Sequence, residues 1–169
     1  MNGKLAVLVG VVLGTVFSLA IVGIVYKIAA PTILFKEVRS TYSFDKTVDL
    51  IIKRINQKEG WQVTGIVNQQ KEILNAGGVD VGKVKVIKFC NGKLSGEMLS
   101  DDNSKFMATN MPLSISVYEK SDGRVVIGLN NGYLMSRLFS GTREGKIMQK
   151  VVKDMEEVLS FMHFRFTIF

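Results

Sequence analysis

The sequence predicts an α+β protein in which an N-terminal transmembrane helix precedes a small sheet of about five strands covered by helices. Three observations predict this class. An uncharged apolar stretch opens the chain, strand-like and helix-like segments alternate after it, and 47% hydrophobic with 22% charged residues is typical of a folded chain. We divide the 169 residues into an anchor (1–30), one α+β domain (31–160) and an aromatic C-terminal tail (161–169).

The anchor contains 22 residues without a charge, from Leu5 to Tyr26. At about 1.5 Å per residue they form a helix of about 33 Å, which is enough to cross a hydrocarbon layer of about 30 Å. A cleaved signal peptide is the competing interpretation, but its apolar core is only about 7–15 residues long and ends in a site of small residues. Here the site would be KIAAPT, where Ile28 replaces a small residue and Pro31 would follow the cut. We therefore expect a single-pass protein of the cell membrane.

The charges beside the anchor bear on its orientation. Lys4 and the terminal amine precede the apolar stretch, whereas Lys27, Lys36 and Arg39 follow it. Cytoplasmic flanks carry an excess of Lys and Arg. The count favours a cytoplasmic domain by a narrow margin and leaves the side of the membrane open.

Small residues within the anchor bear on its pairing with other helices. Gly10, Gly14 and Ser18 are spaced by four and fall on one helix face, where two helices can approach closely. Small residues are also common in membrane helices that do not pair. Both a dimer through this face and an unpaired helix stay open.

The domain begins with a strand and a helix. The segment ILFKEVRS (33–40) has strand character, and Ser43 is a suitable N-cap for the helix that follows, which Gly60 ends. Asp45 lies in the first turn, where a negative charge is favourable. The apolar residues recur at spacings of three and four, which predicts one buried face: Phe44, Val48, Ile51, Ile52 and Ile55.

Two further strands follow. The second, WQVTGIVN (61–68), directs Trp61 and Val63 inward, and Ile66 is a further candidate for the inner face. Gly65 interrupts the alternation as a bulge would. The third, KVKVIKFC (83–90), ends at the single cysteine, Cys90. Next, NGKLSGEMLS (91–100) predicts a short helix capped by Asn91. Its packing face comprises Leu94, Met98 and Leu99.

The clearest local feature is a hairpin, LSISVYEK and RVVIGLNN joined by SDG, because Asp122-Gly123 between alternating runs is a strong turn signal. It places Ile115 and Val117 opposite Val126 and either Gly128 or Leu129. A helical patch with glycines follows, and then Thr142 begins a last helix. Its buried stripe comprises Ile147, Val151, Met155, Val158 and Leu159.

The order of these segments resembles the domain of unknown function family 302, from Ile33 to about Leu159. The resemblance is carried by SFDKTVDLIIKRI, GW, GGVDVGKVKVIKFCN, MPLSISVYEKSDGRVVI and NGYLMSRLFSG. It implies a compact sheet covered by helices, frequent homodimers and no established general reaction. In related membrane-attached members a second cysteine often follows the Met-Pro pair, where this chain has Leu113. We therefore do not expect two-thiol redox or metal chemistry here.

Cys90 is the one catalytic candidate. A thiol at the end of a strand, with a helix start after it and Lys88 and Lys93 nearby, could be held partly as thiolate and support redox or sulfur chemistry. Against this, free cysteine is among the most buried residue types, and the branched strand with Phe89 predicts an apolar setting. Packing is the preferred interpretation of Cys90.

Other chemistries lack their residues. In the loop NAGGVDVGKV the spacing of Gly77, Gly82 and Lys83 imitates a P-loop, but Val84 replaces Ser or Thr and a strand follows instead of a helix. The turn at 101–103 lacks the spacing of a calcium loop. One histidine, His163, with one cysteine forms no zinc cluster, so we expect neither a metal nor a cofactor. The net charge is +7, but the basic residues form no block along the sequence, so nucleic acid is not an expected partner.

The tail SFMHFRFTIF alternates Met162, Phe164, Phe166 and Ile168 with polar residues, which fits a terminal strand in the core or between subunits. Its aromatic density would also suit contact with lipid or a membrane-protein partner. We thus expect a membrane-anchored accessory module that binds a ligand or partner and forms a homo-oligomer, and enzyme activity is not indicated. A thiol-dependent protein using Cys90 and a structural subunit of a larger membrane complex are the alternatives.

Overall fold

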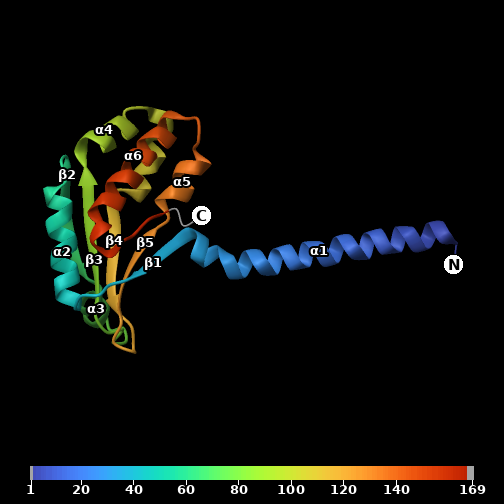
Figure 1. Cartoon of the computed structure of the whole chain (residues 1–169), viewed down its shortest axis with the longest axis horizontal. Helices are drawn as coiled ribbons and strands as arrows, with labels where there is room; N and C mark the ends of the chain where they lie inside the picture. The colour runs from blue at the N-terminus through green and yellow to red at the C-terminus, as the bar shows by residue number, and fades with distance from the viewer. Residues whose placement is uncertain (1, 167–169) are drawn as a thin grey trace. The chain divides into compact units, whose positions relative to one another are not determined.

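The structure is a computed structural model that describes residues 2–166 and consists of two compact units, Met1–Leu34 and Phe35–Phe169 (Figure 1). The first unit is one helix, α1 (Gly3–Leu34). The part Gly3–Lys27 has a mean hydropathy of 2.7 and none of it is buried, so by length and composition it could cross a membrane. The predicted strand from Ile33 was wrong in its first two residues, because α1 continues through Pro31 to Leu34 and the strand begins at Phe35.

The second unit is built on one antiparallel sheet of five strands, which confirms the predicted α+β class. The strands lie in the order β1-β5-β4-β3-β2. Their bounds are β1 Phe35–Arg39, β2 Trp61–Asn68, β3 Val84–Asn91, β4 Leu113–Glu119 and β5 Val125–Asn130. The predicted bulge is present, since the register of β2 against β3 shifts between Val63 and Gly65.

Helices connect and cover the strands. Their bounds are α2 Phe44–Gln57, α3 Gln69–Asn75, α4 Gly92–Leu99, α5 Gly132–Leu138 and α6 Arg143–Val158, with 3₁₀ helices η1 Asp102–Asn110 and η2 Ser160–Met162. The predicted caps Asn91 and Thr142 both accept backbone N–H groups, from Leu94 and Gly145. Ser43 is the N-cap of α2 by position, although its side chain accepts no capping hydrogen bond.

The core lies between the sheet and the helices α2 and α6 (Figure 1). Alternate strand residues meet the apolar stripes of both helices there, because side chains point to one face of a strand at every second position. The fully buried side chains include Ile51 and Ile55 of α2 and, from the sheet, Ile87, Val117 and Ile127. The predicted helix faces and the core position of Trp61 are thus confirmed. The inward position considered for Ile66 was wrong, because Ile66 follows the bulge in β2 and is 50% exposed.

The hairpin forms at the predicted turn, but one of the two predicted residue pairs is shifted by one position. Ile115 is opposite Leu129, as expected, but Val117 is opposite Ile127 and not Val126. The turn is longer than SDG alone, because Lys120 N–H donates to Arg124 O at 2.8 Å and Gly123 N–H to Lys120 O at 2.8 Å.

The tail departs from the predicted strand. Through Phe166 it contains the turn η2 and a left-handed residue, His163 (φ 54°), and no strand is described there. Phe164 and Phe166 are both buried and pack edge to face at 4.8 Å, so these two aromatics belong to the core. Ile168 lies outside the described residues.

Candidate functional site

The candidate site is a cleft of about 220 Å³ at one end of the sheet. The ends of β3, β4 and β5 form one side, the inner face of α6 forms another, and the chain that leaves η1 through the cis Met111-Pro112 bond closes a third. Phe166 reaches it from the tail. Its lining residues are Phe89, Thr109, Asn110, Pro112, Leu113, Ser114, Ile115, Leu129, Asn130, Gly132, Val151, Val152, Met155 and Phe166.

The cleft combines an apolar floor with an uncharged polar rim. Phe89, Leu129 and Met155 are buried and belong to the main core. Apart from Pro112, the exposed lining residues are polar and supply hydroxyl and amide groups: Thr109, Asn110, Ser114 and Asn130. None of the described residues that line the cleft carries a charge. Small-molecule sites typically have this form, an apolar concave surface with a few polar groups at defined places.

The single tryptophan lies next to the cleft floor. The rings of Trp61 and Phe89 are 5.7 Å apart, and the indole N–H of Trp61 donates to Asp154 Oδ2 at 2.9 Å. Lys58 Nζ lies 3.3 Å from Asp154 Oδ1 and 2.5 Å from Glu157 Oε2. Hydrogen bonding to Glu157 raises the pKa of Lys58. These contacts tie β2 and the end of α2 to α6, and thereby hold Phe89 at the cleft.

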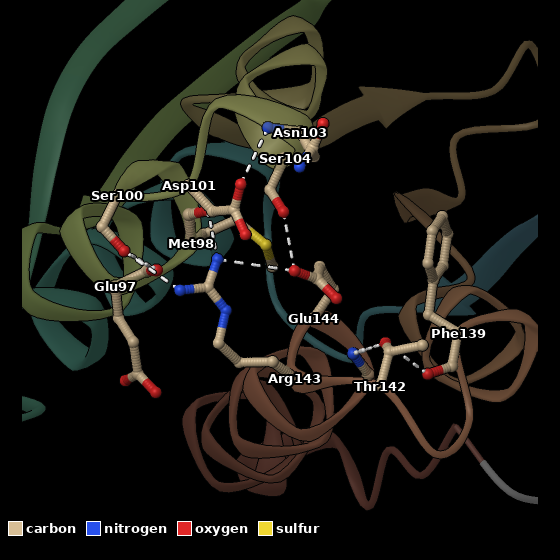
Figure 2. Close-up of polar contacts among 11 residues, drawn as sticks. Glu97, Met98, Ser100, Asp101, Asn103, Ser104, Phe139, Thr142, Arg143 and Glu144 are labelled. Carbon is tan, nitrogen blue, oxygen red and sulfur yellow. Dashed lines mark hydrogen bonds and ion pairs between the residues drawn. The ribbon is translucent and has the colours of Figure 1, made fainter.

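A polar cluster, shown in Figure 2, attaches the start of α6 to α4 and η1. Ser104 Oγ donates to Glu144 Oε1 at 2.6 Å, and this bond lowers the pKa of Glu144 to about 2. Arg143 donates to Ser100 Oγ at 3.1 Å and to Met98 O at 3.4 Å. Because η1 leads into the cleft wall at Thr109, these bonds position that wall relative to α6.

Cys90 lies on the other face of the sheet from the cleft floor. Its side chain is half-buried and its Sγ is 3.0 Å from Ser95 Oγ. Phe89 is opposite Leu113 in the β3–β4 pair, so position 113 shares the face of Phe89 and not that of Cys90. This chain has Leu113, and a cysteine at that position, as the resemblance implies for related members, would point away from Cys90.

A second polar contact crosses the sheet over β5. The Tyr118 hydroxyl of β4 donates to Glu37 of β1, and Lys120 Nζ donates to the same carboxylate at 2.8 Å. Burial and the Glu37 bond raise the pKa of Tyr118 above its usual range, and hydrogen bonds from Lys120 and Tyr118 lower that of Glu37. Gly128 lies between them, and a Cβ there would be 2.6 Å from Ser116 Oγ. The contact fastens β1 to the sheet.

The remaining sequence candidates do not converge. Lys83 pairs with Glu119 at 3.3 Å, and the P-loop-like segment leads into β3. Asp101 caps η1 by accepting Asn103 N–H at 2.9 Å. Within residues 2–166, no group of three His, Cys, Asp or Glu side chains could hold a metal ion. The cleft itself was not found from the sequence, because its walls come from residues far apart in the chain.

A larger and more open groove of about 460 Å³ lies between α2 and the end of α6. It is lined by Lys53, Arg54 and Lys58 together with Glu157. Lys58 is already paired with Glu157, and Arg54 donates to Ser160 Oγ at 3.1 Å and lies over the Phe161 ring. Because these internal contacts already pair much of the charge in the groove, we prefer the cleft as the candidate binding site.

Taken together, the sheet, the covering helices and the cleft define a small antiparallel α+β domain that carries an apolar pocket. The family described as "Domain of unknown function DUF302" matches residues 36–162, and the chain belongs to this family, as its motifs predicted. A crystal structure of uncharacterized conserved protein DUF302 from Bacillus stearothermophilus has the same fold, with a TM-score of 0.65 and 15% identity over 76% of this chain and 98% of that chain. No curated protein matches the chain.

Proposed function

We propose that the chain is a single-pass membrane protein whose DUF302 domain binds a small molecule or a partner beside the bilayer. The observation that carries this proposal is the helix Gly3–Lys27, which is unburied and carries no charge from Leu5 to Tyr26. A soluble protein would bury such a helix in its own core, and here none of it is buried. A transmembrane segment satisfies both its length and its composition.

Binding, rather than catalysis, is the activity that the cleft supports. Its described lining residues include no acid, base or thiol that could transfer a proton or attack a substrate. The apolar floor and polar rim are suited to holding a molecule in one orientation. The predicted homodimer rests on the family resemblance and stays a prediction.

Purification of the full chain in detergent, followed by native mass spectrometry, tests the binding proposal. We expect an added mass that is released on unfolding, and the same experiment reports the number of chains. A spectrum that shows the chain without any bound small molecule or protein, at every detergent concentration, would contradict a binding module.

A thiol-dependent protein is the second candidate, because Cys90 is only half-buried and its Sγ lies 3.0 Å from the Ser95 hydroxyl. Its rate of alkylation by iodoacetamide, measured against pH in the folded full chain, tests it. A rate well above that of the unfolded chain near neutral pH would support a working thiol. Reaction that occurs only after unfolding would exclude it and leave Cys90 as packing.

A further inference from the structure

We infer that the cleft is a binding site for a small, uncharged amphiphile that is drawn from the bilayer, meaning a short apolar chain or single ring that bears a hydroxyl or carbonyl group. This inference rests on the membrane anchoring proposed above and adds the place and the chemical class of the ligand.

The size of the cleft limits the ligand. An apolar cavity of about 150 Å³ holds benzene. At about 220 Å³, this cleft holds one ring with a few further atoms, or a short alkyl chain. The acyl chain of a whole phospholipid would not fit within it.

The lining fixes the chemical class. Phe89, Leu129, Met155 and Phe166 offer only apolar surface, so the body of the ligand is apolar. The rim offers hydroxyl and amide groups, which donate to or accept from a neutral oxygen. No described lining residue offers a cation, so a carboxylate or phosphate would lose water at the rim without gaining an ion pair. A neutral head group is therefore favoured, even though the whole chain has a net charge of +7.

Chain connectivity points to the bilayer as the source. Phe35, where the domain begins, is opposite Asn130 at the rim of the cleft. Only residues 28–34 separate Phe35 from Lys27, the last residue of the candidate span. A chain of that length reaches at most about 30 Å even when fully extended. Whatever the orientation of the domain, this end of the sheet therefore lies within about 30 Å of the end of the candidate span.

Trp61 provides a direct measurement, since it is the one tryptophan in the sequence and its ring is in contact with Phe89. We would titrate the full chain, in dodecyl maltoside micelles, with 6-bromohexan-1-ol and follow quenching of Trp61 fluorescence by bromine, which requires close approach. We expect saturable quenching by the alcohol. The matched anion, 6-bromohexanoate, should bind about tenfold more weakly or worse.

Variants then locate the site. Val152→Phe adds bulk inside the cleft and Asn110→Phe adds it at the exposed rim, where the fold tolerates it more easily. Both substitutions should weaken the binding of 6-bromohexan-1-ol by about tenfold or more. Val79→Phe, on a loop residue that is 77% exposed, is the matched control and should change nothing. Retained quenching in both folded cleft variants would overturn the site, and equal affinity for the anion would overturn the ligand class.

Two further arms separate the alternatives. If quenching appears only after Thr167–Phe169 are deleted, the chain's own tail occupies the cleft and the proposal fails; equal quenching with and without these residues supports it. Carbonate extraction of membranes that contain the same chain tests the anchor independently. If carbonate releases the chain but the chain still binds the alcohol, the anchor and the bilayer as the source of the ligand are refuted, and the binding site is not. If the chain stays in the membrane but shows no saturable quenching, the binding site in the cleft is refuted, and the anchor is not.

Discussion

The helices α1 and α6 are both rich in apolar residues but differ in what those residues contact. In α6 the apolar residues form one stripe, and Ile147, Met155 and Val158 are almost fully buried against the rest of the domain. In α1 they surround the helix, and large side chains such as Phe17 remain 68% exposed. An amphipathic helix is stabilised by its own fold, whereas a helix that is apolar all round requires an apolar environment from outside.

This difference means that the two units should respond to substitution in separate ways. Changes in α1 should alter membrane attachment and leave the folding of the domain unchanged. Changes in the core should do the reverse. The predictions below test this separation in order of decreasing expected effect.

The largest effect is expected from charges placed in the middle of α1. Each arginine near the centre of a membrane helix costs about 2.5–3.5 kcal/mol, so the double change Leu13→Arg and Phe17→Arg costs about 5–7 kcal/mol of insertion free energy. Flotation with liposomes should show the variant shifting from the lipid fraction to the soluble or aggregated fraction. The same two changes at the exposed domain residues Ile66 and Leu74 are the control and should leave flotation unchanged.

A core truncation is expected to have the next largest effect, and it acts on the other unit. Ile87 is fully buried in the sheet, so Ile87→Ala should lower the free energy of unfolding by about 2–5 kcal/mol. Urea denaturation followed by Trp61 fluorescence measures it. Ile24→Ala removes the same atoms from a residue of α1 that is 59% exposed, and should leave the urea midpoint unchanged. A similar loss in both variants would mean that the helix and the domain fold as one unit.

Glycine substitutions sharpen the comparison further. At Gly145, in the first turn of α6, a Cβ would lie 2.0 Å from Phe139 O, which is backbone and cannot move aside alone. Gly145→Ala should therefore cost about 1–3 kcal/mol in the same assay. At Gly14 of α1 a Cβ would meet no described atom within 4 Å, so Gly14→Ala should be neutral for unfolding. Equal stability of the two variants would show that α6 does not approach Phe139 as closely as described.

The smallest effect concerns pH. The pKa of Glu144 falls from 4.5 to about 2 in the folded state, so its carboxylate stabilises the fold fully above pH 4.5 and loses this contribution as the pH falls towards 2. Glu144→Gln should therefore be less stable than the unsubstituted chain at pH 6, and this difference in the free energy of unfolding should narrow below pH 4.5. In a Ser104→Ala background the difference caused by Glu144→Gln should be smaller, since Ser104 donates the principal bond. Urea midpoints across this pH range measure both, and a gap that does not vary with pH would contradict the assignment.

Local chemistry made much of the fold predictable from the sequence. The Asp122-Gly123 turn specified the hairpin, the spacing of Ile51 and Ile55 specified the buried face of α2, and Asn91 and Thr142 specified helix starts. The helix α3 and the 3₁₀ helix η1 were missed, because both are short and have no apolar periodicity of their own.

The tail and the cleft show where local chemistry is insufficient. A period of two predicted a strand at the C-terminus, but a chain that bends at His163 also brings Phe164 and Phe166 into the core. The cleft unites Phe89, Leu129 and Met155, which belong to three different elements. Sequence spacing carries no information about such a meeting, since it depends on how the strand ends and α6 pack.

The most direct test of the two-unit account is carbonate extraction of membranes from cells that express the full chain, combined with the intact mass of the extracted protein. The account predicts that the protein stays in the membrane pellet with residues 1–30 still attached. A protein released into the supernatant, or one whose mass corresponds to a start after Ala30, would contradict it.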